Sequence, residues 1–389
     1  MKRRIFMLVF MISLVLLLAA CGGKNDNQPN ITDDFIPEAA ETVTIAPIEP
    51  IEGLTDDRTL VSENELTNEA VDDTALEPDN PAAEKAPPLV EIVAEPLGQM
   101  IDDYLSQGLF WGTVLVAQGD DIILHNAYGD IYGSGIRNTI NTQFYIASVT
   151  KQFTGAAILQ LESEGKLAVS DTLNNFFPDY DGLENVTVQD LLVMQGGFGD
   201  FLLTMDHYGG ATIEGIESYI FTGWGGKRSE NFSYSNSDYW LLGRIIEQVS
   251  GMTVEQYFAE KLLIPAGMAN SGIAGSPTAR INDANDWRAA MACTAAGLVS
   301  TAWDLSLWLD AYFGGKLFDE SMLNQIRRGH YNYGWYFRDN SIWLHAGGVG
   351  YYSSIVMYDS ESETKIIILA NAGMSAPRAL EIIEDVLRR

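Results

Sequence analysis

Strand-like and helix-like segments follow one another in an order that limits how this chain can fold. Residues 110–129 contain two runs rich in β-branched and aromatic residues around Gly119-Asp120, which is a hairpin pattern. Four more strand-like runs lie near the other end, at residues 332–338, 341–347, 350–360 and 364–372. Between these two regions the periodicity is mostly helical, as at residues 153–165, 187–195, 239–251, 253–265 and 302–315. This order predicts an α+β fold, in which one antiparallel sheet is built from both ends around an inserted helical subdomain.

Composition divides the chain into three parts. Residues 1–20 start with Lys2, Arg3 and Arg4 and continue with an apolar run of about 15 residues, typical of a secretory signal and short for a membrane span. From Gly22 to Glu95 there are nineteen acidic and three basic residues, a net charge of −16, with few aromatic residues. We expect residues 21–95 to form an acidic, disordered tether. Residues 96–389 are long enough for one large domain, with flanking helices expected at 96–108 and 375–389.

A cysteine follows the leader directly. The run Leu18-Ala19-Ala20-Cys21 resembles the lipobox of bacterial lipoproteins, in which the cysteine carries the lipid. More than one acyl chain gives stable anchoring, so the resemblance implies an extracytoplasmic protein anchored to the bacterial cell membrane through Cys21. One other cysteine, Cys293, remains, so no intramolecular disulfide is expected after processing.

Charge and histidine spacing exclude several classes of partner. The formal net charge of −30 at pH 7 argues against nucleic acid as a partner. The histidines, His125, His207, His330 and His345, are scattered without paired ligand spacing, which argues against a metal site. We therefore expect no cofactor, a small-molecule or peptide substrate, and a monomer.

Ser148 and Lys151 lie three residues apart where the sequence changes from strand-like to helix-like. On a helix this spacing places both side chains on one face, so the amine can reach the hydroxyl and help to make it a nucleophile. The same Ser-x-x-Lys spacing occurs in polar, turn-like contexts at Ser163 to Lys166 and at Ser362 to Lys365. These two matches are expected to carry no chemistry.

Two further segments add chemistry to this pair. Tyr234 and Asn236 directly precede a helical pattern, and a tyrosine near a lysine loses its proton more easily and can relay protons. His345 enters a strand-like run that continues with Gly347 and Gly348. Glycines on an edge strand allow a substrate to approach closely, and a free N–H there can bind a developing oxyanion.

These three motifs, in this order, resemble those of the serine β-lactamase and penicillin-binding-protein superfamily. The similarity is greatest to its class C-like branch, which includes D-alanyl-D-alanine carboxypeptidases, esterases and D-aminopeptidases. Two more segments resemble motifs of this superfamily. The segment "LLVMQGGFGDF" resembles its Leu-Leu-x-His-x-Ser-Gly motif, and "AAGLVSTAWDLSLWL" resembles its Gly-Leu-x-Ser-Thr-x-x-Asp-Leu motif. The resemblance covers residues 96–389 and implies a β-lactamase/transpeptidase-like fold.

The resemblance also implies a role for each motif residue. Ser148 would be the acylated nucleophile, with Lys151 easing its deprotonation and Tyr234 acting as general base and proton shuttle. Asn236 would contact substrate and Lys151, and His345 would take the place of the Lys or His that opens the third motif. The backbone N–H groups of Ser148 and Gly348, beside Gly347, would form the oxyanion hole. Whether Lys151 or Tyr234 takes the serine proton stays open.

Two departures from the family pattern concern substrate choice. Met194 and Gly196 stand where many relatives carry His and Ser, and Ala346 stands where relatives often carry a carboxylate-binding Thr. The interpretation is a secreted, lipid-anchored serine hydrolase that acts through a Ser148 acyl-enzyme on cell-envelope peptide, amide, ester or β-lactam substrates. The alternative is a catalytically inactive surface binding module with a penicillin-binding-like fold.

Overall fold

The computed structural model describes residues 90–132, 134–204, 212–279, 293–339 and 341–388. The expected leader, Cys21, most of the expected tether, and His207 lie outside these residues. No helix among the described residues is long and apolar enough to cross a membrane.

An eight-stranded sheet organises the fold, with strand order β1-β3-β2-β11-β10-β9-β8-β7. Every neighbouring pair in it is antiparallel. Its strands are β1 (Ile92–Val93), β2 (Phe110–Gln118), β3 (Asp121–Tyr128), β7 (Tyr331–Asn332), β8 (Trp335–Arg338), β9 (Ile342–Val349), β10 (Tyr352–Asp359) and β11 (Thr364–Gly373). The first three strands come from the N-terminal side and the rest from the C-terminal side, so the prediction of one antiparallel sheet built from both ends is confirmed.

Strand β1 lies inside the segment that the sequence analysis assigned to the tether. Ile92 and Val93 pair with His125 and Leu124 of β3 at the edge of the sheet. The large sheet therefore includes two β-branched residues that precede the expected domain boundary at residue 96.

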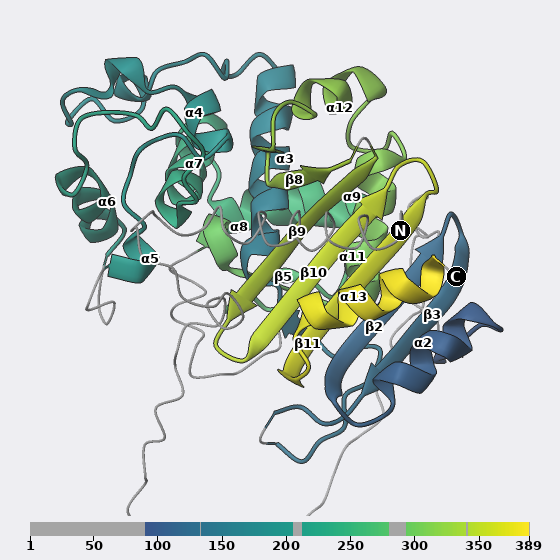
Figure 1. The fold of residues 1–389 in the computed structure, drawn as a ribbon. Coiled ribbons are helices and arrows are strands. Elements are labelled where there is room, and N and C mark those ends of the chain that lie inside the picture. Colours follow the sequence, from purple (N-terminus) through teal and green to yellow (C-terminus); the bar gives the residue numbers. More distant parts are fainter. Residues whose placement is uncertain (1–89, 133, 205–211, 280–292, 340, 389) are drawn as a thin grey trace, which may run out of the picture. The chain divides into compact units, whose positions relative to one another are not determined.

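Helices cover both faces of this sheet. Helices α2 (Leu97–Leu105) and α13 (Ala376–Leu387) lie on one face, with α13 crossing in front of β10 and β11, and α11 (Ala302–Phe313) lies behind the sheet (Figure 1). The run Ile366–Leu369 in β11 is accordingly buried without alternation. A strand that is covered on both faces is expected to read as a continuous apolar run.

The chain between β3 and β7 is mostly helical. It contains the helices α3 (Thr150–Ser163), α4 (Val188–Leu192), α5 (Phe201–Thr204), α6 (Ile213–Thr222), α7 (Asn236–Ser250), α8 (Val254–Tyr257), α9 (Ile264–Ala266) and α12 (Glu320–Ile326), and the π-helical turn η4 (Phe258–Leu263). Short 3₁₀ turns are η1 (Ala147–Val149), η2 (Leu173–Asn175) and η3 (Leu183–Asn185). A small antiparallel sheet of β4 (Phe144–Tyr145), β6 (Leu298–Ser300) and β5 (Gly272–Ile273) was not predicted.

Helix α3 is the central helix of this insertion and is buried along most of its length. It approaches the chain before β8 so closely that a Cβ on Gly155 would overlap the carbonyl of Tyr333 and lie 2.7 Å from its Cα. Its first turn includes the fully buried Lys151 and Gln152. The packing of α3 therefore fixes the position of Lys151 relative to the large sheet.

Candidate active site

Ser148 lies in the 3₁₀ turn η1, which joins strand β4 to helix α3. Phe144 and Tyr145 are held by pairing with β6, and α3 starts two residues after the serine. Ala147 has φ 46, in the left-handed region that residues with a Cβ adopt rarely. Such strained positions cluster at active sites, and here the turn leaves Ser148 half-buried while both of its neighbours are buried.

Lys151 is fully buried and its ammonium has three acceptors. Its Nζ lies 3.2 Å from Ser148 Oγ, 2.7 Å from Asn236 Oδ1 and 2.8 Å from the backbone oxygen of Ala295. Burial lowers the pKa of Lys151 to about 7, although the negative charge of Asp200 opposes this shift. A substantial fraction of the amine is therefore neutral near pH 7. Two N–H groups can then remain on Asn236 and Ala295, with the lone pair directed at Ser148.

Tyr234 contacts the same serine from the loop before α7. Its hydroxyl donates to Ser148 Oγ at 2.7 Å, and its ring centroid lies 4.8 Å from Lys151 Nζ. Ser235, the next residue, caps α7 by accepting from the N–H of Ser237. This cap holds Tyr234 and Asn236 at the start of a rigid helix, so both side chains reach the Ser148–Lys151 pair.

The other two Ser-x-x-Lys matches form no such pair. Lys166 makes an ion pair with Glu164 at 2.8 Å, and Lys365 makes one with Asp310 at 2.7 Å. Ser163 donates to the backbone oxygen of Gln160, and Ser362 donates to the carboxylate of Asp359. Among the three matches, the structure brings serine and lysine together at Ser148 and Lys151.

Strand β9 passes directly beside the Ser148 turn at Gly347. A Cβ on Gly347 would overlap the backbone oxygen of Ile146 and lie 2.9 Å from the backbone nitrogen of Ser148. Ser354 of β10 donates to the same Ile146 oxygen at 2.7 Å. Glycine at position 347 is therefore what allows the strand and the turn to lie in contact.

Gly348 is exposed and presents its N–H on the free side of β9. Within the described residues, β8 pairs with β9 only at Ile342–Leu344, so the following part of β9 has no strand partner on that side. The β9–β10 hairpin closes at the pair Val349 and Tyr352, and hydrogen-bonded pairs alternate from there. Gly348 falls in a non-hydrogen-bonded pair, so its N–H points away from β10.

His345 is buried and neutral. Its Nδ1 lies 2.6 Å from the backbone oxygen of Ala346, which can only accept, so Nδ1 carries the proton. Its Nε2 lies 3.3 Å from the hydroxyl of Tyr331 and accepts from it. Burial, together with the nearby charge of Lys151, lowers the pKa of His345 to about 3. The third motif thus opens with a neutral imidazole.

Comparison with known proteins identifies the family of this chain. The family model for beta-lactamase matches residues 97–387. The chain belongs to the beta-lactamase family. The strand-turn-helix that carries Ser148, the Tyr234 loop and strand β9 all lie within the matched residues.

Individual relatives within this family share part of the chain. The penicillin-binding-protein-like PbpX of Bacillus subtilis (strain 168) is 32% identical over 183 residues, 45% of this chain and 44% of PbpX. The teichoic acid D-alanine hydrolase of Staphylococcus aureus (strain MRSA252) is 27% identical over 178 residues, 46% of this chain and 44% of that protein. The chain thus matches less than half of the length of each. The crystal structure of FmtA from Staphylococcus aureus is similar with a TM-score of 0.68 and 21% identity, covering 77% of this chain and 92% of FmtA.

The departures from the beta-lactamase family motif at Met194 and Gly196 have a local packing reason. Met194 is buried, and its sulfur accepts from the N–H of Ser235 at 3.2 Å. The N–H of Gly196 donates to the buried carboxyl of Asp238 at 3.1 Å, and a Cβ at position 196 would lie 2.8 Å from the other oxygen of Asp238. A serine at position 196 would therefore require the Asp238 side chain to move.

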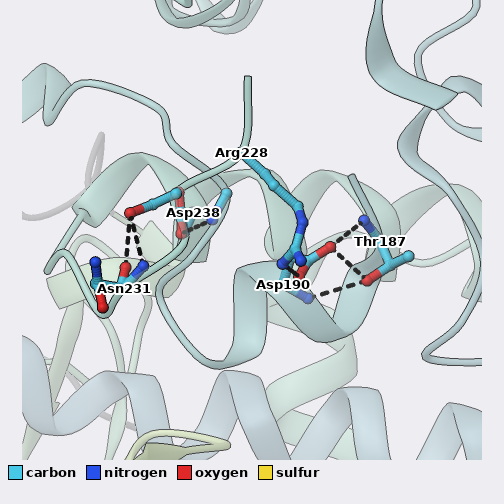
Figure 2. Close-up of polar contacts among 7 residues, drawn as sticks. Thr187, Asp190, Arg228, Asn231 and Asp238 are labelled. Atoms are coloured by element: carbon cyan, nitrogen blue, oxygen red, sulfur yellow. Dashed lines mark hydrogen bonds and ion pairs between the residues drawn. The ribbon is translucent and has the colours of Figure 1, made fainter. Parts of the chain in front are cut away.

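A second polar group lies at the start of α4. Asp190 accepts from the backbone N–H and the hydroxyl of Thr187 and from the guanidinium of Arg228 at 2.9 Å (Figure 2). These contacts tie the loop after α6 to the start of α4.

Asp200 is a residue of the site that sequence reasoning missed. Its Oδ2 accepts from the backbone N–H and from the side-chain Nδ2 of Asn236, at 3.2 and 2.8 Å. Its Oδ1 accepts from the N–H of Leu202 at 3.0 Å. The residue lies within the quoted phrase "LLVMQGGFGDF", but no spacing in the sequence connects it with Asn236, which follows 36 residues later.

Proposed function

We propose that this chain is a serine hydrolase that acts through an acyl-enzyme on Ser148. The observation that carries the proposal is the convergence on one half-buried hydroxyl of a buried lysine amine at 3.2 Å and a tyrosine hydroxyl at 2.7 Å. A serine hydroxyl is a weak nucleophile until an adjacent base activates it. The residues come from two separate parts of the chain, the η1–α3 segment and the loop before α7, which lie 86 residues apart in sequence.

In the acylation step, Ser148 Oγ bonds to the carbonyl carbon of the substrate and its proton passes to Lys151 Nζ. The lowered pKa of Lys151, about 7, gives a base matched to neutral pH. Tyr234 then passes its proton to the leaving group as the bond between that group and the carbonyl carbon breaks, and the proton held by Lys151 restores the tyrosine. In deacylation a water molecule attacks the ester and gives a proton to Lys151, Tyr234 protonates Ser148 Oγ as the acyl bond breaks, and the proton on Lys151 again restores the tyrosine.

The oxyanion that forms during both steps needs hydrogen-bond donors. The N–H of Ser148 and the free N–H of Gly348 are the two donors we propose, with Gly347 allowing the strand to approach the turn. We propose that Asn236 holds Lys151 and contacts the substrate. His345, being neutral, contributes by fixing Tyr331 and the strand rather than by supplying a charge.

For the substrate, we propose an ester or amide whose acyl group carries no carboxylate, such as a D-alanyl ester of a cell-envelope polymer. The third motif offers a neutral histidine and an alanine at position 346, so it supplies neither a cation nor a hydroxyl to a substrate carboxylate. A D-alanyl ester presents an ammonium group instead, which suits a chain of net charge −30. One of the relatives is named a teichoic acid D-alanine hydrolase, which supports this choice.

We further propose that the protein is secreted and held at the cell membrane by lipid on Cys21. The support is the sequence of residues 1–21 described above. A lipid anchor followed by an acidic tether would hold the hydrolase domain within reach of cell-envelope polymers.

Intact-mass analysis tests the proposal. The purified protein is mixed in turn with an activated ester of D-alanine and with a penicillin, and adduct formation and decay are followed. We expect an adduct that appears and decays with the ester, that maps to Ser148, and that is absent in Ser148→Ala. The matched control is Ser163→Ala, which removes a serine of another Ser-x-x-Lys match and should leave the adduct unchanged. A folded parent protein that forms no adduct with either reagent would identify the chain as a binding module.

A further inference from the structure

Asp200 accepts hydrogen bonds from Asn236 of the candidate active site, and it belongs to none of the three motifs that predicted the site. It precedes α5 and contacts Asn236 at the start of α7 through the backbone N–H and the side-chain amide. The amide oxygen of the same Asn236 lies 2.7 Å from Lys151 Nζ. A continuous hydrogen-bonded path therefore runs from Asp200 through Asn236 and Lys151 to Ser148.

The carboxylate decides which way the Asn236 amide faces. A carboxylate can only accept, so the Nδ2 group must face Asp200 and the Oδ1 must face Lys151. The flipped amide would place its oxygen against a carboxylate oxygen and its NH₂ group against the lysine amine. Two acceptors, Asn236 Oδ1 and the Ala295 oxygen, then occupy two N–H groups of Lys151, and the third direction faces Ser148.

We propose that Asp200 is a positioning residue for this site, whose carboxylate fixes the Asn236 amide and thereby directs the lone pair of Lys151 at Ser148. For its effect on catalysis, the inference rests on the acylation of Ser148 proposed above. Asp200 acts on Lys151 through Asn236 and through its charge.

The charges around Lys151 support this role. Tyr234 from the loop before α7 and Tyr239 from α7 place their rings 4.8 and 5.8 Å from the amine. His345 from β9 is neutral, and Tyr239 has a pKa raised well above its usual range by burial. Asp200 therefore supplies the negative charge that opposes burial and raises the pKa of Lys151.

The test compares Asp200→Asn and Asp200→Ala with the parent and with a matched control. Asp319→Asn is the control, because Asp319 caps α12 by accepting from Met322 N at 2.9 Å, as Asp200 does for Leu202 before α5. The first readout is the titration of Lys151. It is monitored by NMR of protein labelled with ¹³C at the lysine ε-carbon, in which the Lys151 signal is identified by its loss in Lys151→Arg. The second readout is the rate of Ser148 acylation by an activated ester as a function of pH.

In Asp200→Asn we expect the midpoint of the Lys151 titration to move to lower pH, because a negative charge that favours the ammonium form is removed. The low-pH limb of the acylation profile should move with it. In Asp200→Ala the Asn236 amide loses its fixed partner, and acylation should fall about tenfold or more even where Lys151 is neutral, as expected for loss of a hydrogen bond to a charged group. Asp319→Asn should alter neither readout.

An unchanged Lys151 midpoint in Asp200→Asn would overturn the inference, even if the variant were less active, because a helix cap alone would then explain the loss. Thermal melts of each variant check folding, and Asp200→Asn retains an acceptor for Leu202 if Asp200→Ala fails to fold. If even the parent forms no ester adduct, the proposed function fails, whereas the Lys151 titration still decides the role of Asp200.

Discussion

Replacing Gly347 by alanine should damage the candidate active site while the fold remains. A Cβ at this position would overlap the backbone oxygen of Ile146 and lie 2.6 Å from Ser354 Oγ and 2.9 Å from the nitrogen of Ser148. Backbone atoms cannot rotate away as a side chain can, so β9 and the Ser148 turn must separate. Overpacking of this kind costs about 1–3 kcal/mol of folding free energy. A shift of about 1 Å at the reacting groups costs roughly 10²-fold in rate, similar to loss of one oxyanion donor.

The assay measures thermal unfolding and the rate of Ser148 acylation by an activated ester in the same preparations. Each kcal/mol of lost folding free energy should lower Tm by about 2–4 °C in a domain of this size class. Gly348→Ala is the control for stability, because a Cβ there would meet no atom closer than the Tyr352 oxygen at 4.0 Å. We expect Gly347→Ala to be folded, modestly less stable and about 10²-fold slower in acylation. Parental acylation and an unchanged Tm in Gly347→Ala would refute the close contact between β9 and the turn.

Three further predictions follow from the same site and from the leader. The rate of acylation should rise with pH through about 7. Burial lowers the pKa of Lys151 to about 7, and the neutral amine present above that pH accepts the serine proton. A rate that is independent of pH in this region would exclude Lys151 as the base. Ala346→Thr should raise the specificity constant for a carboxylate-terminated peptide by about tenfold or more, since a hydrogen bond to a charged group contributes about 1.5–3 kcal/mol. The specificity constant for a neutral ester should stay nearly unchanged. An equal response from both substrates would show that position 346 does not determine carboxylate binding. Cys21→Ser should abolish incorporation of labelled fatty acid into the protein in growing cells. Unchanged incorporation would show that Cys21 does not carry the lipid.

Features with a local signal were predictable from the sequence. The hairpin around Gly119-Asp120 matches β2 and β3, and the helix after Ser148 matches α3, because turn residues and periodicity act over a few positions. The pairing of Ser148 with Lys151 was also accessible, since both residues share one helical face. Among three identical spacings, however, the choice of Ser148 required the neighbouring motifs and is now supported by its contacts.

Features that depend on distant contacts could not be predicted. Asp200 reaches Asn236 through a loop whose course no local pattern determines. The neutral state of His345 follows from burial beside Lys151, which only the packed structure reveals. The small sheet of β4, β6 and β5 consists of strands of two or three residues, too short to show a period of two.

The central position of β11 beside β2 has a consequence for how the protein acquires its structure. The registered pair Leu115 and Ile367 joins two strands separated by about 250 residues of chain, and β9, which borders the Ser148 turn, lies two strands further on. Contacts of such long range form slowly, because the entropy of closing the loop is lost before the sheet gains its hydrogen bonds. During synthesis the N-terminal residues leave the ribosome first, so β2 has an unpaired edge until β11 has been made. The Ser148 turn can contact β9 only after nearly all of the chain has been synthesised.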